Sequence, residues 1–218
     1  MIQMYHVSMR YKKNIDAIHD VNLSVKKGEF VFLVGPSGAG KTTVLKLLYR
    51  ELVPSEGQIA VAGYDLSKLK GKQLPYFRRK LGIVFQDFKL LSNRTVEQNI
   101  AFSMRVVGAK RSHVRRNVAR VLEWTNLTHR KDALPEDISG GEQQRTAIAR
   151  AMVNDPLLIL ADEPTGNLDA ELSLEIMRLF ERFNLRGTTI LIATHNYNLV
   201  KQFNKRIIWI DHGRIVET

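Results

Sequence analysis

The chain has 218 residues, 44% apolar and 25% charged, which is typical of a soluble globular protein with one expected domain. No run approaches the roughly 18 consecutive apolar residues of a membrane span, and the N-terminus lacks the apolar core of a signal peptide, so we expect a cytosolic chain. The chain has no cysteine, which excludes disulfides and thiolate metal sites. Its formal net charge of +11 is consistent either with an anionic partner or with an ordinary solvated basic surface.

Three short apolar runs, at residues 30–34, 157–161 and 189–193, are typical of strands buried on both faces of a parallel sheet. Between and around them, apolar residues at helical spacing predict helices over residues 41–52 and 112–125. Strands that alternate with helices imply an α/β fold, whose ligands bind at the carboxyl ends of the strands.

The segment "GPSGAGKT" follows the first of these strands and matches the pattern G-x-x-x-x-G-K-[ST]. Glycines let the backbone turn several N–H groups onto a phosphate, a lysine adds a cation, and the final hydroxyl can ligate Mg²⁺. A helix that begins there strengthens the anion site. The predicted cradle consists of Gly35, Pro36, Ser37, Gly38, Ala39, Gly40, Lys41, Thr42 and Thr43.

Two further strand ends supply side chains for phosphate chemistry. In "LLILADEP", Asp162 can reach a Mg²⁺ ion and Glu163 can face an attacking water. His195, in "ATHN", can contact the γ-phosphate or hold Glu163 and the water in position. Gln86, in "VFQDFKLL", could touch both Mg²⁺ and water, and Tyr11 could either stack on an adenine or be an ordinary surface aromatic.

A second glycine-rich helix start, "ISGGEQQR", lies at residues 138–145 and predicts a helix over residues 139–153. Ser139 suits the N-cap, and Gly140 and Gly141 permit close approach of the backbone to an anion. The phosphate loop covers a triphosphate from one side only. If the second helix start belongs to another copy of the chain, two copies placed head to tail would close each other's nucleotide sites.

Taken in order, "GPSGAGKT", "FQD", "ISGGEQQR", "LLILADEP", "GNLD" and "ATHN" resemble the nucleotide-binding domain of ABC ATPases, over essentially the whole chain. The resemblance implies a single domain over residues 1–218, with a mostly parallel core sheet flanked by helices and an N-terminal antiparallel β portion. It also implies an inserted helical subdomain at about residues 88–155, which would grip a membrane partner.

The resemblance further implies that ATP and Mg²⁺ are the cofactors and that the chain forms a homodimer around ATP. In such a dimer "ISGGEQQR" is the signature segment and acts in trans, and Asp169 lies in the loop between the two sites. Two departures from the family pattern are Ile138 in place of the commoner Leu and Glu142 in place of Gln. The implied roles are catalytic for Glu163 and His195, metal binding for Thr42, Gln86 and Asp162, and nucleotide contact for Tyr11, Gln86, Ser139, Gly140, Gly141, Glu142 and Asp169.

Within the family, "GEQQR", "DEPTGNLD" and residues 74–100 are similar to the FtsE-like cell-division ATPases. This implies an FtsX-like integral membrane partner, attachment to the cytoplasmic face of the cell membrane, and control of peptidoglycan hydrolysis outside the cell. Cytosolic division proteins are possible further partners, and no nucleic acid is expected. Lipoprotein-release and macrolide-export ATPases share most of these motifs, and a nonenzymatic ATP-gated scaffold also stays open at this point.

Overall fold

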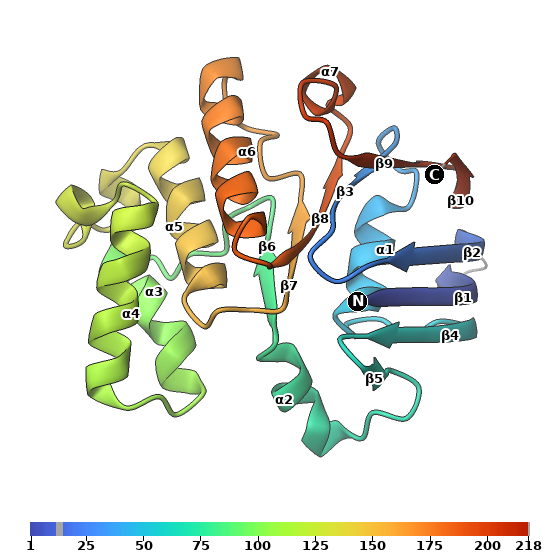
Figure 1. Cartoon of the computed structure of the whole chain (residues 1–218), viewed down its shortest axis with the longest axis horizontal. Helices are drawn as coiled ribbons and strands as arrows, with labels where there is room; N and C mark the ends of the chain where they lie inside the picture. Colours follow the sequence, from blue (N-terminus) through green and yellow to red (C-terminus); the bar gives the residue numbers. More distant parts are fainter. Residues whose placement is uncertain (12–14, 218) are drawn as a thin grey trace.

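A six-stranded sheet forms the centre of the molecule in the computed structural model, which describes residues 1–11 and 15–217 (Figure 1). Neighbouring strands in this sheet are parallel, except that the C-terminal strand of the chain is antiparallel to the strand beside it. In spatial order the strands are β10 (Arg214–Glu217), β9 (Arg206–Asp211), β3 (Phe30–Val34), β8 (Thr189–Thr194), β7 (Leu158–Asp162) and β6 (Leu81–Val84). The α/β fold with a mostly parallel core sheet is therefore confirmed.

The N-terminal part of the chain forms a second, antiparallel sheet, and helix α1 (Lys41–Leu48) lies between it and the parallel sheet (Figure 1). Its strands, in order, are β2 (Ile15–Val25), β1 (Ile2–Tyr11), β4 (Glu56–Val61) and β5 (Tyr64–Asp65). Both faces of the parallel sheet are buried, because successive apolar residues of its strands point alternately into two different cores. On β3, Val31 and Leu33 join the core around α1, whereas Phe30 and Phe32 join the core on the other face.

The remaining helices cover the other face and one side of the parallel sheet (Figure 1). Apolar residues of α6 (Ala170–Asn184) and α7 (Tyr197–Val200) pack on the face opposite α1. Helices α3 (Val96–Val106), α4 (Arg111–Trp124) and α5 (Gly140–Met152) surround a third apolar core, and the short α2 (Leu74–Arg78) precedes β6. Within residues 1–11 and 15–217, no helix combines the length and apolar character needed to cross a bilayer.

The register of the parallel strands brings their carboxyl ends to one edge of the sheet. This edge is defined by the pairs Val34 with Thr194, Asp162 with Ala193, and Val84 with Ala161. The segments that follow these strands are the phosphate loop, "EP", "HN" and "FQD". Four motifs separated by up to 160 residues in sequence are therefore neighbours, as expected for a ligand site in a parallel sheet.

Helix α1 is shorter than the apolar spacing predicts, because it ends at Leu48 instead of extending to residue 52. Arg50 has a φ of 61°, and the N–H groups of Glu51 and Leu52 both turn back to donate to the carbonyl of Lys46. These bonds satisfy a carbonyl at the end of the helix and terminate it. Leu52 still packs, partly buried, against the core around α1.

Gly35 is the residue whose size matters most for the start of the phosphate loop. A Cβ atom there would lie 2.0 Å from the carbonyl oxygen of Ile210 on β9, and a backbone atom cannot move away as a side chain can. We expect Gly35→Ala to lower the free energy of unfolding by about 2 kcal/mol or more, the upper part of the range for overpacking. Urea denaturation measures this. Gly71→Ala is the control, because nothing lies within 4 Å of a Cβ there, and an equal loss in both variants would contradict the expectation.

Candidate active site

The phosphate loop runs from β3 into α1 and folds around its own lysine. Gly38 and Gly40 have φ values of 80° and 104°, in the left-handed region that favours glycine. The Lys41 side chain is only 6% exposed, and its ammonium donates to the carbonyls of Gly35 at 2.8 Å and Pro36 at 2.9 Å. In the rest of the loop Pro36, Ser37, Gly38 and Thr42 are exposed, Gly40 is half-buried, and Gly35, Ala39 and Thr43 are buried.

Glu163 lies immediately beside this lysine, with 11% of its side chain exposed. Its Oε1 atom is 3.4 Å from Lys41 Nζ and 3.0 Å from His195 Nδ1, and the backbone N–H of His195 donates to Oε2 at 3.3 Å. The φ of Glu163 is 44°, an uncommon value for a residue with a side chain, and its N–H donates to Ala193 O at 2.9 Å. The predicted catalytic pair is therefore assembled, with the carboxylate held from two sides.

Asp162 occupies the carboxyl end of β7, one residue before Glu163. Its Oδ1 atom is buried and has no hydrogen-bond partner among the described residues. Burial raises the pKa of the Asp162 carboxyl; the Thr42 hydroxyl opposes this effect and the Glu163 carboxylate adds to it. A divalent cation would pair the free oxygen and favour the ionised carboxylate, so Thr42 and Asp162 have the donor set that suits Mg²⁺.

Gln86 and Tyr11 each lie close to a different part of this edge. Gln86 is exposed, and its Nε2 atom is 3.8 Å from the position of a Cβ on Gly166, in the turn that follows Glu163. The Tyr11 hydroxyl is 3.2 Å from Thr43 Oγ1, so the ring at the end of β1 lies against the first turn of α1. Gln86 is thus beside the turn that follows Glu163 and Tyr11 beside the phosphate loop, while their contacts with metal and adenine stay predictions.

Arg150 is a residue of this region that the sequence patterns did not indicate. It lies on α5, and its guanidinium donates to the carbonyl of Phe88 at 2.6 Å and to that of Lys89. Phe88 and Lys89 both have positive φ, at 57° and 51°, and such a pair needs outside support. Arg150 therefore holds the loop that begins at Gln86. No sequence signal marks this contact, because its partners are more than 60 residues away.

The second glycine-rich segment starts α5 with a reciprocal cap. Ser139 Oγ accepts from the N–H of Glu142 at 3.3 Å, and Glu142 Oε2 accepts from the Ser139 N–H at 2.9 Å and its hydroxyl at 3.0 Å. Arg130 Nε donates to the other carboxylate oxygen at 3.1 Å. The bonds from Ser139 and Arg130 lower the pKa of Glu142. The Glu142 side chain therefore caps its own helix in this chain, and its expected contact with a nucleotide stays a prediction.

The two glycines of the segment have different surroundings. Gly140 is exposed and a Cβ there would meet nothing within 4 Å, whereas a Cβ on the buried Gly141 would lie 2.3 Å from Leu172 Cδ2 on α6. Asp169 caps that helix, accepting from the Leu172 N–H at 2.8 Å. Gly141 thus packs on its own chain through Leu172, and a side chain placed there would require the Leu172 side chain to move. Ser139 and Gly140 are the exposed residues that a second copy could approach.

Comparison with known proteins decides the family. A family model described as ABC transporter matches residues 18–166, which include the phosphate loop, the second glycine-rich segment and "ADEP". The chain belongs to the ABC transporter family. With the site geometry above, it is an ABC ATPase that binds and hydrolyses ATP.

The relatives of this ABC ATPase match nearly its whole length. The cell division ATP-binding protein FtsE of Streptococcus pneumoniae is 50% identical over 99% of this chain and 94% of its own, and that of Bacillus subtilis is 47% identical over 99% and 95%. Among solved structures, the dimeric ATP-binding cassette MJ0796 in a post-hydrolysis state bound to ADP and Pi is similar, with a TM-score of 0.90. It is 34% identical, and the match covers 100% of this chain and 97% of that one.

Glu163→Gln tests the division between binding and chemistry. The amide keeps the size of the side chain but cannot accept a proton, so ATP hydrolysis should fall on the order of a hundredfold or more, the scale of a lost general base. ATP binding should persist. Phosphate release and nucleotide binding measure the two effects, and Glu136→Gln, at an exposed position, is the control. A Glu163→Gln protein that still turns over at the parental rate would assign the role elsewhere, first to His195.

Proposed function

We propose that this ABC ATPase is the ATP-hydrolysing subunit of a membrane complex that acts in cell division. Support comes from FtsE relatives that are 44 to 50% identical over nearly the whole chain, together with the complete set of strand-end residues at one sheet edge. Its partner is an FtsX-like integral membrane protein, which holds it at the cytoplasmic face of the cell membrane. Through that partner, ATP turnover controls peptidoglycan hydrolysis outside the cell.

In the proposed mechanism, Lys41 and the backbone N–H groups of the phosphate loop bind the triphosphate. Thr42, Asp162 and Gln86 would hold Mg²⁺, which would neutralise charge on the phosphate oxygens. Glu163 orients the attacking water and accepts its proton, and His195, at 3.0 Å, keeps the carboxylate directed toward that water. The observation that carries this assignment is the Glu163 carboxylate between Lys41 and His195.

The proposed active form is a dimer in which each chain completes the other's site. Ser139 and Gly140 stand exposed at the positive end of α5, and no hydrogen bond links them to the phosphate loop of the same chain within the described residues. A second copy can therefore present this helix end to the γ-phosphate. The dimeric state of MJ0796 with ADP and Pi supports a dimer of this chain.

Mixing two inactive variants tests this sharing. Gly140→Asp places a carboxylate where the other chain's γ-phosphate would lie, and the repulsion should abolish ATP-dependent dimerisation and hydrolysis while the chain's own loop still binds ATP. Lys41→Ala should be inactive for loss of the loop cation. In a mixed dimer both defects fall on one site and the other site is intact, so part of the activity should return on mixing. Normal hydrolysis by Gly140→Asp alone would contradict the shared site.

The proposed contact with the membrane partner is a groove between α2, β6, α3 and α5. Its cavity has a volume of about 650 Å³. Leu74 and Pro75 line it from α2, Phe102 and Val106 line it from α3, and Arg150 lies on its wall. An exposed groove with apolar walls and a few cations suits an amphipathic segment of a partner. Because Arg150 also holds the loop after Gln86, occupancy of the groove is coupled to the site by a direct contact.

Phe102→Asp tests the groove. Phe102 is 43% exposed, so the charge should leave folding and basal ATP hydrolysis intact while preventing copurification with the membrane partner. Leu185→Asp is the matched control, because Leu185 is 85% exposed and lies outside the groove. Undiminished copurification of Phe102→Asp would contradict the proposed surface. The identity of the copurifying protein also separates a cell-division complex from a lipoprotein-release or macrolide-export complex.

A further inference from the structure

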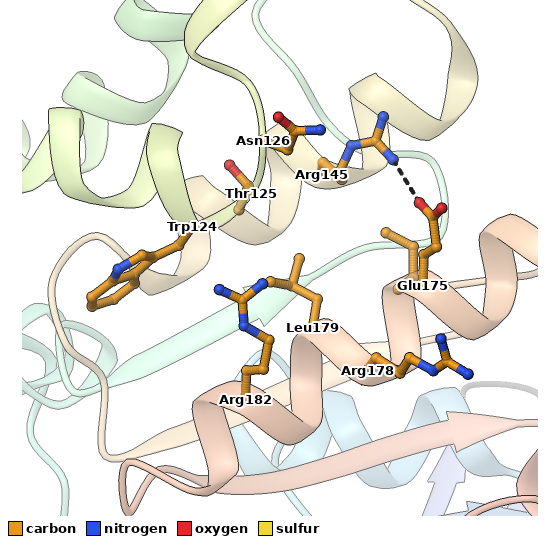
Figure 2. Close-up of a pocket in the computed structure, with 9 residues that line it drawn as sticks. Trp124, Thr125, Asn126, Arg145, Glu175, Arg178, Leu179 and Arg182 are labelled. Carbon is orange, nitrogen blue, oxygen red and sulfur yellow. Dashed lines mark hydrogen bonds and ion pairs between the residues drawn. The ribbon is translucent and has the colours of Figure 1, made fainter.

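A basic recess lies between the end of α4, the middle of α5 and the outer face of α6 (Figure 2). It has a volume of about 390 Å³ and none of its lining residues belongs to the active site or to the groove described above. Figure 2 shows Leu179 and Arg182 reaching from α6 toward Trp124 and Thr125 on the opposite wall. The walls combine charged and apolar side chains: Trp124, Thr125, Asn126, Arg145, Glu175, Ile176, Arg178, Leu179 and Arg182.

Positive charge in this recess exceeds negative charge, with three arginines against one glutamate. Arg145 is 20% exposed and reaches Glu175 at 3.5 Å, while its Nε–H is buried without a hydrogen-bond partner among the described residues. Arg178 and Arg182 are exposed and form no ion pair within the part of the chain that the structure describes. Figure 2 shows the Arg182 guanidinium directed into the recess and that of Arg178 directed away from it along α6, so both exposed cations can meet an anion that covers the rim, and Arg145 has an unused donor.

The other wall of the recess is aromatic and held in place. The Trp124 ring lies beneath two guanidinium groups, with Arg186 3.5 Å and Arg120 4.8 Å from its centroid. Both contacts are cation–π interactions, which hold the ring in place, and the charge of Arg120 is already paired with Asp155. Leu179 and Ile176 of α6 complete an apolar floor. Tryptophan and arginine on a concave surface are the residue types that most often carry binding energy at protein interfaces.

We propose that this recess binds an acidic segment of a protein partner. Two carboxylates of the segment pair with Arg178 and Arg182, because a guanidinium fork matches a carboxylate with two parallel hydrogen bonds. A neighbouring apolar side chain packs on Trp124 and Leu179. The concave shape favours a protruding peptide over a lipid surface, since a flat bilayer would not reach Arg145, which is four-fifths buried. The site goes beyond the proposed function, because it requires neither ATP nor the membrane partner.

Binding is measured with a labelled peptide in which aspartate alternates with leucine, and with a second peptide carrying asparagine in place of aspartate. Trp209→Phe leaves Trp124 as the only tryptophan, so its fluorescence reports contact at the recess. Arg178→Gln with Arg182→Gln removes the two available cations. The matched control, Arg111→Gln with Arg115→Gln, removes the same charge from exposed positions at the far end of α4.

We expect the acidic peptide to bind the full chain and to change Trp124 fluorescence, and the asparagine peptide to do neither. Affinity should fall at least tenfold in the Arg178 and Arg182 double variant and less than threefold in the control. Equal losses in both double variants, or no binding of the acidic peptide, would overturn the proposal. So would vesicles of anionic phosphatidylglycerol that bind through Arg178 and Arg182 while the peptide does not, because the surface would then be a lipid site.

Discussion

The parallel hydrogen-bond register of β3, β8, β7 and β6 is the constraint on which the active site depends. It places the ends of four strands at one edge, so that a loop, a carboxylate pair, a histidine and a glutamine meet. Side chains alternate between the faces of a sheet, and a slip of one residue turns each to the opposite face. A slipped β7 would exchange the directions of Asp162 and Glu163. The apolar residues on both faces, which fix this register, are therefore as necessary to the chemistry as the polar residues beyond them.

The edge also brings opposite charges together on side chains that are nearly buried. Lys41 and Glu163 are both nearly buried, and each has additional partners: two carbonyls for the ammonium and the His195 ring and N–H for the carboxylate. Such pairing offsets the cost of desolvating the two charges. Asp162 differs, because one of its oxygens has no partner among the described residues and burial raises its pKa. The Glu163 carboxylate is thus paired on both oxygens, whereas Asp162, the proposed metal ligand, keeps one oxygen without a partner among the described residues.

Local motifs made the phosphate loop, the buried strands and the helix start at Ser139 predictable, since each depends on neighbours in sequence. The convergence at one sheet edge followed from parallel topology. Three features were not predicted: the clamp of Arg150 on Phe88 and Lys89, the cap formed by Glu142, and the packing of Gly141 on Leu172. The spacing of Ser139 and Glu142 is a local signal of the cap, whereas the clamp and the Gly141 packing depend on contacts between distant segments. Even α1 ended early because of the backbone conformation of Arg50, which apolar spacing does not encode.

Helix α5 links the exposed glycine-rich helix start to the loop that follows Gln86. Its first turn presents Ser139 and Gly140, and Arg150, near its other end, holds the carbonyls of Phe88 and Lys89. A helix rises 1.5 Å per residue, so these two ends are about 16 Å apart on one rod. Rods of this kind move as units because their backbone hydrogen bonds are internal. A displacement of α5 against the parallel sheet would therefore shift the exposed helix end and the loop after Gln86 together, and would couple the proposed partner groove to the proposed surface toward a second copy.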